Sequence, residues 1–119
     1  MFSRKKLILI ALAALAAAPA AANVWASLIY DCAWVNETAR IDFKNFIATY
    51  AGTDTKLDVG HFDFGFQAPW GRYIAFHILP SHDEIWDKRP ETFSGTAISG
   101  FPALPRLAIH TPVTCSIVR

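Results

Sequence analysis

Apolar and polar residues alternate along several stretches of this chain, a pattern typical of β-strands with one buried face. In "ASLIYDCAWV" (residues 26–35) the side chains of one parity are large and apolar or cysteine: Leu28, Tyr30, Cys32 and Trp34. In "ARIDFKNF" (residues 39–46) apolar residues alternate with Arg, Asp and Lys. The segment "NET" (residues 36–38) is predicted to be the turn between these two strands, and "AGTDT" (residues 51–55) the next turn.

The middle of the chain contains a predicted β-hairpin. In "GHFDFGF" (residues 60–66) every second residue from 62 onwards is a phenylalanine. In "RYIAFHIL" (residues 72–79) isoleucine and phenylalanine alternate with tyrosine, alanine and histidine. The sequence Pro69-Trp70-Gly71 between them fits a three-residue loop, because proline suits its first position and Gly71 can adopt the left-handed conformation.

This loop determines which residues face each other across the hairpin. It pairs Ala68 with Arg72 and thereby places three apolar pairs on the core face: Phe66 with Ile74, Phe64 with Phe76, and Phe62 with Ile78. On the outer face Asp63 lies opposite His77. Such a cross-strand pair contributes ~0.2–1 kcal/mol on an open sheet face, so the stretch is interpreted first as a core strand with a solvated outer side.

One short helix is predicted in "SHDEIWDKRP" (residues 81–90). Ser81 is a suitable N-cap, and Glu84 follows at the spacing of a capping box. Acidic residues in the first turn and basic residues in the last suit the helix dipole, and Pro90 ends the helix. Ile85 and Trp86 are predicted to pack it against the sheet.

Prolines characterise the C-terminal part of the chain. The segment "SGFPALPRL" (residues 99–107) has two prolines three apart and is interpreted as a rigid crossing between late strands. The segment "RLAIHTPVTCSIV" (residues 106–118) predicts a strand that Pro112 interrupts or places at an edge, because proline cannot donate to a β-ladder.

The first 22 residues have the composition of a signal peptide. Three basic residues precede the apolar run of residues 7–18, and Ala20 and Ala22 have the A-x-A spacing that predicts cleavage after Ala22. The run is shorter than the ~20 apolar residues that cross a bilayer. We expect one exported domain, residues 23–119, that is periplasmic or secreted and is not held at the membrane after cleavage. Cleavage after Ala26 and retention as an uncleaved anchor are the alternatives.

Export changes how the charges and cysteines are interpreted. Removal of the three leader cations leaves 8 Lys and Arg against 10 Asp and Glu, a net charge of −2, which argues against nucleic-acid binding because that requires a basic face. Cys32 and Cys115 predict a disulfide in an oxidising compartment, with reactive thiols or a metal pair as the alternative. The predicted fold is therefore mainly β: six to eight strands in a small antiparallel sandwich or partly open barrel, with one short helix and one disulfide.

The outer face of the hairpin contains weak candidates for a metal site: His61, Asp63 and His77. These residue types bind zinc, and a catalytic zinc site uses three protein ligands. Their spacing matches no metal-binding motif, however, and no G-x-S-x-G nucleophile motif occurs. A solvated strand face is the simpler interpretation, and we expect neither a catalytic centre nor a cofactor.

Aromatic and basic residues outside the predicted core indicate a surface for a protein partner instead. Trp70 lies at the tip of a tight hairpin beside Arg72, and exposed tryptophans are frequent binding anchors. Its alternative placement is folded back onto the hairpin. Trp86 is a second candidate contact, and helix packing is its alternative role.

These observations favour a small exported non-enzymatic binding module, such as an inhibitor, an immunity-like protein or an accessory envelope protein. Two alternatives stay open. One is a metal-binding protein or hydrolase that uses the face of His61, Asp63 and His77. The other is a structural subunit that associates through an exposed sheet edge.

Overall fold

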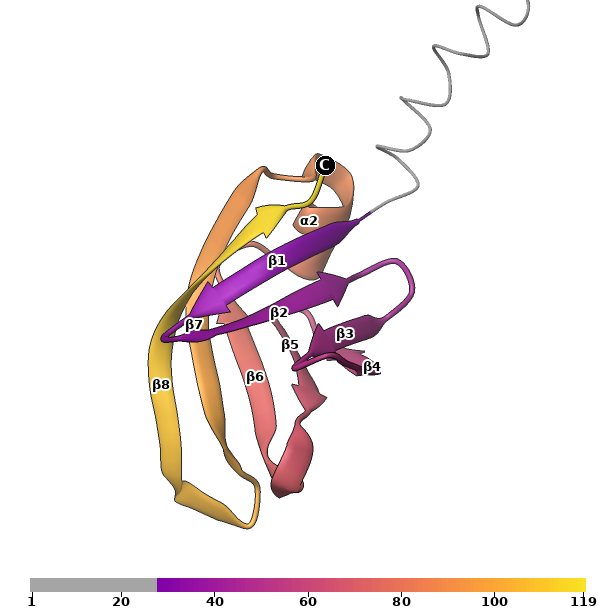
Figure 1. Cartoon of the computed structure of the whole chain (residues 1–119). Helices are drawn as coiled ribbons and strands as arrows, with labels where there is room; N and C mark the ends of the chain where they lie inside the picture. The colour runs from indigo at the N-terminus through magenta and orange to yellow at the C-terminus, as the bar shows by residue number, and fades with distance from the viewer. Residues whose placement is uncertain (1–27) are drawn as a thin grey trace, which may run out of the picture.

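The chain folds into a closed antiparallel β-barrel with one short α-helix, seen in the computed structural model, which describes residues 28–119 (Figure 1). Each strand pairs with the next along the chain, and the last pairs with the first. The strands are β1 Ile29–Trp34, β2 Glu37–Asp42, β3 Ile47–Tyr50, β4 Thr53–Val59, β5 Asp63–Gln67, β6 Tyr73–Ile78, β7 Thr92–Phe101 and β8 Leu104–Ile117. The prediction of a mainly β fold is confirmed, and of the two predicted architectures the barrel is correct, with its sheet fully closed.

The predicted signal peptide and its cleavage site after Ala22 lie outside the described residues. Within residues 28–119 no helix is long and apolar enough to cross a membrane.

The barrel interior is a packed aromatic core. The predicted alternation of β1 is confirmed, because Leu28, Tyr30, Cys32 and Trp34 are all buried. Neighbouring rings contact one another edge-on or stacked, as do Phe64 and Phe76, whose ring centroids are 4.8 Å apart. An eight-stranded barrel is just wide enough for its own side chains. Here the interior is occupied by core side chains, which stabilise the fold.

β5 and β6 form the predicted hairpin with the predicted register. Asp63 lies opposite His77, Phe64 opposite Phe76 and Phe66 opposite Ile74. The connection is a short 3-10 turn, η1 (Pro69–Gly71), in which Trp70 and Gly71 both have positive φ, 69° and 75°.

The prediction that Phe62 belongs to the core is wrong, because its side chain is 50% exposed. The carbonyl of Phe62 still accepts a hydrogen bond from the N–H of Ile78 at 2.9 Å. β5, however, begins only at Asp63, and the chain bends at residues 61–62. The bend turns the side chain of Phe62 out of the barrel.

Two turns are shorter than predicted. The β1–β2 turn consists of Val35 and Asn36 alone, so that Glu37 already belongs to β2. The β3–β4 turn consists of Ala51 and Gly52, both with positive φ, as expected for a two-residue hairpin whose twist matches that of its strands. The shorter β1–β2 turn places Glu37 at the end of a strand and at one end of the barrel.

The predicted helix is α2 (His82–Lys88), which lies at the end of the barrel where the C-terminus lies (Figure 1). The Ser81 hydroxyl accepts a hydrogen bond from the backbone N–H of Glu84 at 3.2 Å, as the capping box predicts. Ile85 is fully buried and anchors the helix. Arg89 adopts the left-handed conformation at the C-cap, which ends the helix just before Pro90.

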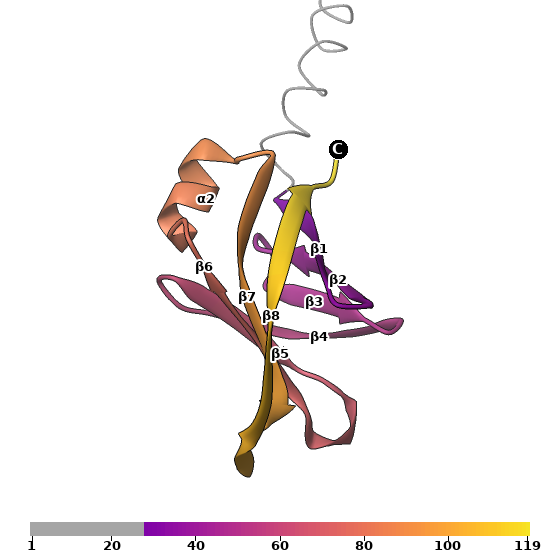
Figure 2. The ribbon, with the colours of Figure 1, turned by 90° about the vertical axis from the view of Figure 1, so that its left-hand side faces the viewer.

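β7 and β8 form a long hairpin that extends past the other end of the barrel (Figure 2). The interpretation of residues 99–107 as a crossing between strands is wrong: they comprise the end of β7, a two-residue turn at Pro102 and Ala103, and the start of β8. Pro112 lies within β8, opposite Thr96 of β7, and does not interrupt the strand.

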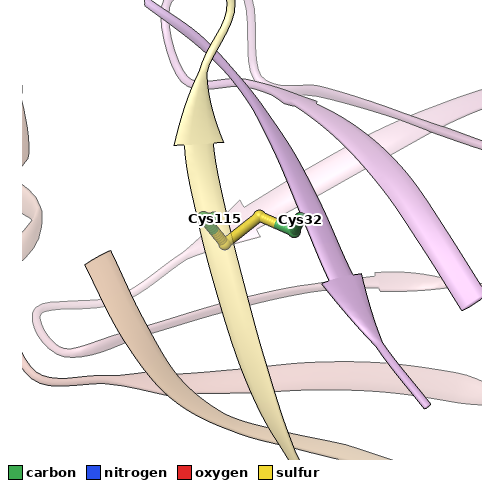
Figure 3. Close-up of a disulfide and its surroundings, with 2 residues drawn as sticks. All are labelled: Cys32 and Cys115. Carbon is green, nitrogen blue, oxygen red and sulfur yellow. A yellow bond between two sulfur atoms is a disulfide. The ribbon is translucent and has the colours of Figure 1, made fainter. Parts of the chain in front are cut away.

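The predicted disulfide between Cys32 and Cys115 is confirmed (Figure 3). The two cysteines lie directly opposite each other on β1 and β8, where only four residue pairs close the barrel. The covalent bond therefore joins the first and last strands across the seam that makes the sheet a barrel.

Candidate functional site

A network of five polar side chains lies at the end of the barrel opposite α2. The two carboxylate oxygens of Glu37 accept hydrogen bonds from Arg72 Nη2 at 2.8 and 3.0 Å. Trp34 Nε1 donates to Glu37 at 3.0 Å, and the Tyr50 hydroxyl donates to the same carboxylate. Arg72 also donates to Tyr50 from Nη1 at 3.1 Å and to Ser99 Oγ from Nε at 2.8 Å. The network joins four strands and the residue after η1, and it covers this end of the core.

The electrostatics of the network keep its two charged groups ionised. Burial raises the pKa of Glu37, but the hydrogen bonds from Tyr50, Arg72 and Trp34 and the charge of Arg72 outweigh it and lower the pKa below the usual value of a glutamate. Burial and the hydrogen bond to Glu37 raise the pKa of Tyr50. A carboxylate held ionised by three donors is a poor proton donor at neutral pH. The network therefore has the chemistry of a structural or recognition site rather than that of a general acid.

Beside the network lies a cleft of about 270 Å³. One wall is the inner face of the β7–β8 hairpin and the other is formed around the β1–β2 turn. The cleft is lined by Trp34, Val35, Glu37, Arg72, Ser99, Gly100, Phe101, Leu107, Ile109 and Thr111. Most of its lining is apolar, and the Glu37–Arg72 ion pair is its only charged part. We call this cleft and the adjoining hairpin tips the open end of the barrel.

The open end carries a concentration of exposed apolar side chains. Ten large hydrophobic residues of the described part of the chain are exposed, and six belong to this end: Val35, Trp70, Phe101, Leu104, Leu107 and Ile109. The tips of the β5–β6 and β7–β8 hairpins both extend at this end (Figures 1 and 2). Isolated exposed hydrophobic residues are ordinary, whereas a group of them on two neighbouring tips makes this end a candidate interaction surface.

Of the two placements considered for Trp70, the exposed one is found. Its side chain is 93% exposed at the tip of η1. The positive φ of Trp70, 69°, is unfavourable for a residue with a Cβ atom, and the tight loop imposes it. The indole is consequently held away from the barrel at the open end.

The other two predicted contact residues are engaged within the protein. Arg72 is half-buried in the polar network, where its guanidinium already has three partners. Trp86 packs against the core from α2, and its indole N–H donates to His82 Nε2 at 2.9 Å. Because α2 and η1 lie at opposite ends of the barrel, Trp70 and Trp86 do not share one surface (Figure 1).

Of the three metal candidates, Asp63 and His77 lie in the sheet and His61 lies in the bend before β5, and these described residues form no metal-binding cluster. Asp63 and His77 are cross-strand neighbours, as predicted, yet no hydrogen bond or ion pair joins them in the described part of the chain. The ring of His61 contacts the ring of Phe62, with centroids 4.5 Å apart. Among residues 28–119 no group of three His, Cys, Asp or Glu side chains is placed to hold a metal ion.

Sequence reasoning missed most of the open end. Glu37 and Tyr50 were not singled out, although Trp34 and Glu37 flank a two-residue turn and are therefore cross-strand neighbours. The inner face of the β7–β8 hairpin is not predicted, because residues 99–107 are interpreted from the sequence as a connection between strands. A usable clue was present: the apolar residues at 107 and 109 continue the parity of buried Val113 and Cys115.

Comparison with protein-family models, with curated proteins and with solved structures finds no match to this chain. The functional interpretation therefore rests on the geometry of the molecule.

Proposed function

We propose that this protein is a small exported non-enzymatic binding module that engages a protein partner through the open end of its barrel. The observation that carries the proposal is the cluster of exposed apolar side chains on the two hairpin tips, with Trp70 at its edge and Ile109 in the cleft. Such residues cost solubility in a free monomer and are usual at the centre of an interface, where a few residues, often including a tryptophan, contribute most of the affinity.

The scaffold supports this role. A closed barrel with a disulfide between its first and last strands fixes the bases of the two hairpins, which reduces the conformational entropy lost on binding. The Glu37–Arg72 ion pair lies in a cleft whose lining is otherwise mostly apolar. A cleft of this kind suits a partner that is recognised mainly by its shape. An inhibitor, an immunity-like protein and an accessory envelope protein would all bind a protein partner in this way, and the proposal includes all three.

The test is affinity capture from envelope and culture-supernatant extracts with oxidised protein of residues 23–119 as bait. Two variants alter the open end: Trp70→Ala and Ile109→Ser. Two controls alter exposed positions elsewhere: Leu79→Ala, at an apolar residue near α2 whose exposure lies between those of Trp70 and Ile109, and the double substitution Asp63→Ala/His77→Ala.

A partner that is retained by both controls and lost by both open-end variants is the expected result. Retention by the open-end variants with loss in Leu79→Ala would move the site to the other end. Loss in Asp63→Ala/His77→Ala alone would favour the outer strand face, and the absence of any captured protein would reject the binding module.

A further inference from the structure

β8 is much longer than the stretch over which β1 covers it. β8 has 14 residues, and β1 pairs only with Thr114–Ile117 at its C-terminal end. β7 accompanies β8 along its opposite side. In the described part of the chain no strand lies along the outer edge of β8 from residue 104 to residue 113. The barrel is closed as a sheet, yet this extension has an open edge (Figure 2).

The direction of the backbone groups on this edge follows from the neighbouring hydrogen bonds. The N–H of Ile117 donates to Glu91 on the β7 side, and the N–H of Val118 donates to Ile29 on the β1 side. Because these groups alternate along a strand, the N–H and C=O of His110 and the C=O of Pro112 are directed to the open edge. Pro112 has no N–H, so the donor available in this regular part of the edge is that of His110.

The open edge runs directly beside the cleft. Ile109 and Thr111 line the cleft from the inner face of β8, and Val35 lines it where β1 turns away into β2. An additional strand along β8 would follow the course that β1 leaves at this turn. Since side chains alternate across a strand, every second residue of the added strand would lie over the apolar cleft.

The hairpin also has a distinctive charge. Between residues 92 and 118 the sequence has no aspartate or glutamate, and Arg106 is its only Lys or Arg. Arg106 is exposed near the start of β8. The hairpin itself therefore presents a cation and no carboxylate to a segment that pairs with this edge, and an acidic residue on the segment is favoured near Arg106.

We propose that an extended segment of the partner adds to the outer edge of β8 as an additional strand, with backbone hydrogen bonds to His110, apolar side chains over the cleft and a carboxylate near Arg106. This inference rests on the proposed function and specifies its mode. A second copy of the chain is a poorer occupant, because edge-to-edge pairing brings two Pro112 residues, neither with an N–H to donate, onto one short ladder and offers Arg106 no carboxylate from residues 92–118 of the other copy.

The probe is a pool of acetylated, amidated octapeptides in which Val, Ile, Phe or Tyr alternates with Thr, Ser or Glu. The pool is passed over immobilised oxidised protein, and the affinities of selected peptides are measured by fluorescence anisotropy. Two protein variants separate backbone from side-chain contacts. His110→Pro removes the edge N–H, whereas His110→Ala retains it. Circular dichroism and urea unfolding establish whether each variant is folded.

The selected peptides are expected to bind wild type and His110→Ala alike, and His110→Pro at least tenfold more weakly. Peptide N-methylation tests the same contact without altering the protein. Methyl groups on one set of alternate amides should weaken binding at least tenfold, and on the other set should have little effect. Replacement of Glu by Lys in the peptide should also weaken binding, and added salt should reduce this difference.

Three results would overturn the inference: no selection over a pool of the same composition with scrambled order, equal binding after either N-methylation, or a concentration-dependent dimer that His110→Pro abolishes. The last result would assign the edge to a second copy. The captured partner separates this inference from the proposed function. A partner lost by Trp70→Ala but retained by a folded His110→Pro would leave the binding module standing and reject strand addition.

Discussion

Reduction of the disulfide between Cys32 and Cys115 tests how this barrel is kept closed. The bond joins directly paired residues of β1 and β8 at the four-pair seam between the first and last strands. Without it the same seam has to be held by backbone hydrogen bonds and side-chain packing alone. We expect the reduced protein to keep the same fold at low denaturant and to unfold much more readily.

The magnitude follows from the length of the loop that the bond closes. The two cysteines are 83 residues apart, and the chain-entropy relation gives an unfolded-state entropy loss of roughly 15 cal/mol/K, or about 4.5 kcal/mol at 25 °C. Domains of this size are stable by about 5–15 kcal/mol in total. The bond thus accounts for a large share of the free energy of unfolding.

Urea unfolding followed by circular dichroism measures this directly on three samples: oxidised protein, protein reduced with dithiothreitol, and Cys32→Ala/Cys115→Ala. With a slope of about 2 kcal/mol/M, the reduced protein should unfold at roughly 2 M less urea than the oxidised protein. The double alanine variant should be the least stable, because both cysteines are fully buried and their replacement also leaves a cavity.

A difference below about 1 kcal/mol between oxidised and reduced protein, with an unchanged urea slope, would refute the reasoning. It would mean that the unfolded chain is already compact enough for the two strands to stay near each other. If the loss appeared only in the alanine variant, packing of the sulfur atoms would be the stabilising factor, and not the restriction of the unfolded chain.

Two further predictions concern pH and the polar network. Burial lowers the pKa of His82 from its usual 6.5, and neutral His82 accepts the hydrogen bond from the Trp86 indole N–H. Its contribution to stability is therefore present above about pH 6.5 and is lost as the pH falls below that value. Urea midpoints at pH 7.5 and pH 5 should differ more in wild type than in His82→Gln, and equal differences would contradict this prediction. Glu37→Gln should lower the free energy of unfolding at pH 7 by about 1–2 kcal/mol, because half-buried Arg72 loses its charged partner. The pKa of Glu37 is lowered from 4.5, so the contribution of its ionised carboxylate to stability is lost as the pH falls below that value. Wild type and Glu37→Gln should therefore converge in their free energies of unfolding in acid. A constant difference down to pH 3 would argue against the ion pair as the cause.

Several features of this protein were predictable because they depend on residues close together in the chain. The register of β5 and β6 follows from a three-residue loop and the alternation of phenylalanines, and the structure reproduces it residue by residue from Asp63 to Phe66. The N-cap of α2 follows from Ser81 and Glu84, three residues apart. The disulfide followed from the number of cysteines and the predicted export.

Other features depended on contacts that no local pattern encodes. The role of Arg72 as a partner contact stays a prediction, whereas its hydrogen bond to Glu37, which is 35 residues away and is predicted to lie in a turn, follows from no local pattern. Phe62 continues the alternation of Phe64 and Phe66, yet the strand begins one residue later and its side chain is exposed. Alternation identifies a buried face only within the strand itself, and it does not show at which residue the strand begins or ends.

The amino-acid sequence alone determined the core face of β1, the β5–β6 hairpin with its register, the helix and the covalent link, because turn geometry, capping and side-chain alternation act over a few residues. The tertiary structure decided that the sheet closes, that Glu37, Tyr50 and Arg72 meet at one end, and that β8 extends beyond β1 with an open edge. These depend on the relative lengths of strands that are distant in sequence, here β1 and β8. The candidate binding surface arises where their pairing stops.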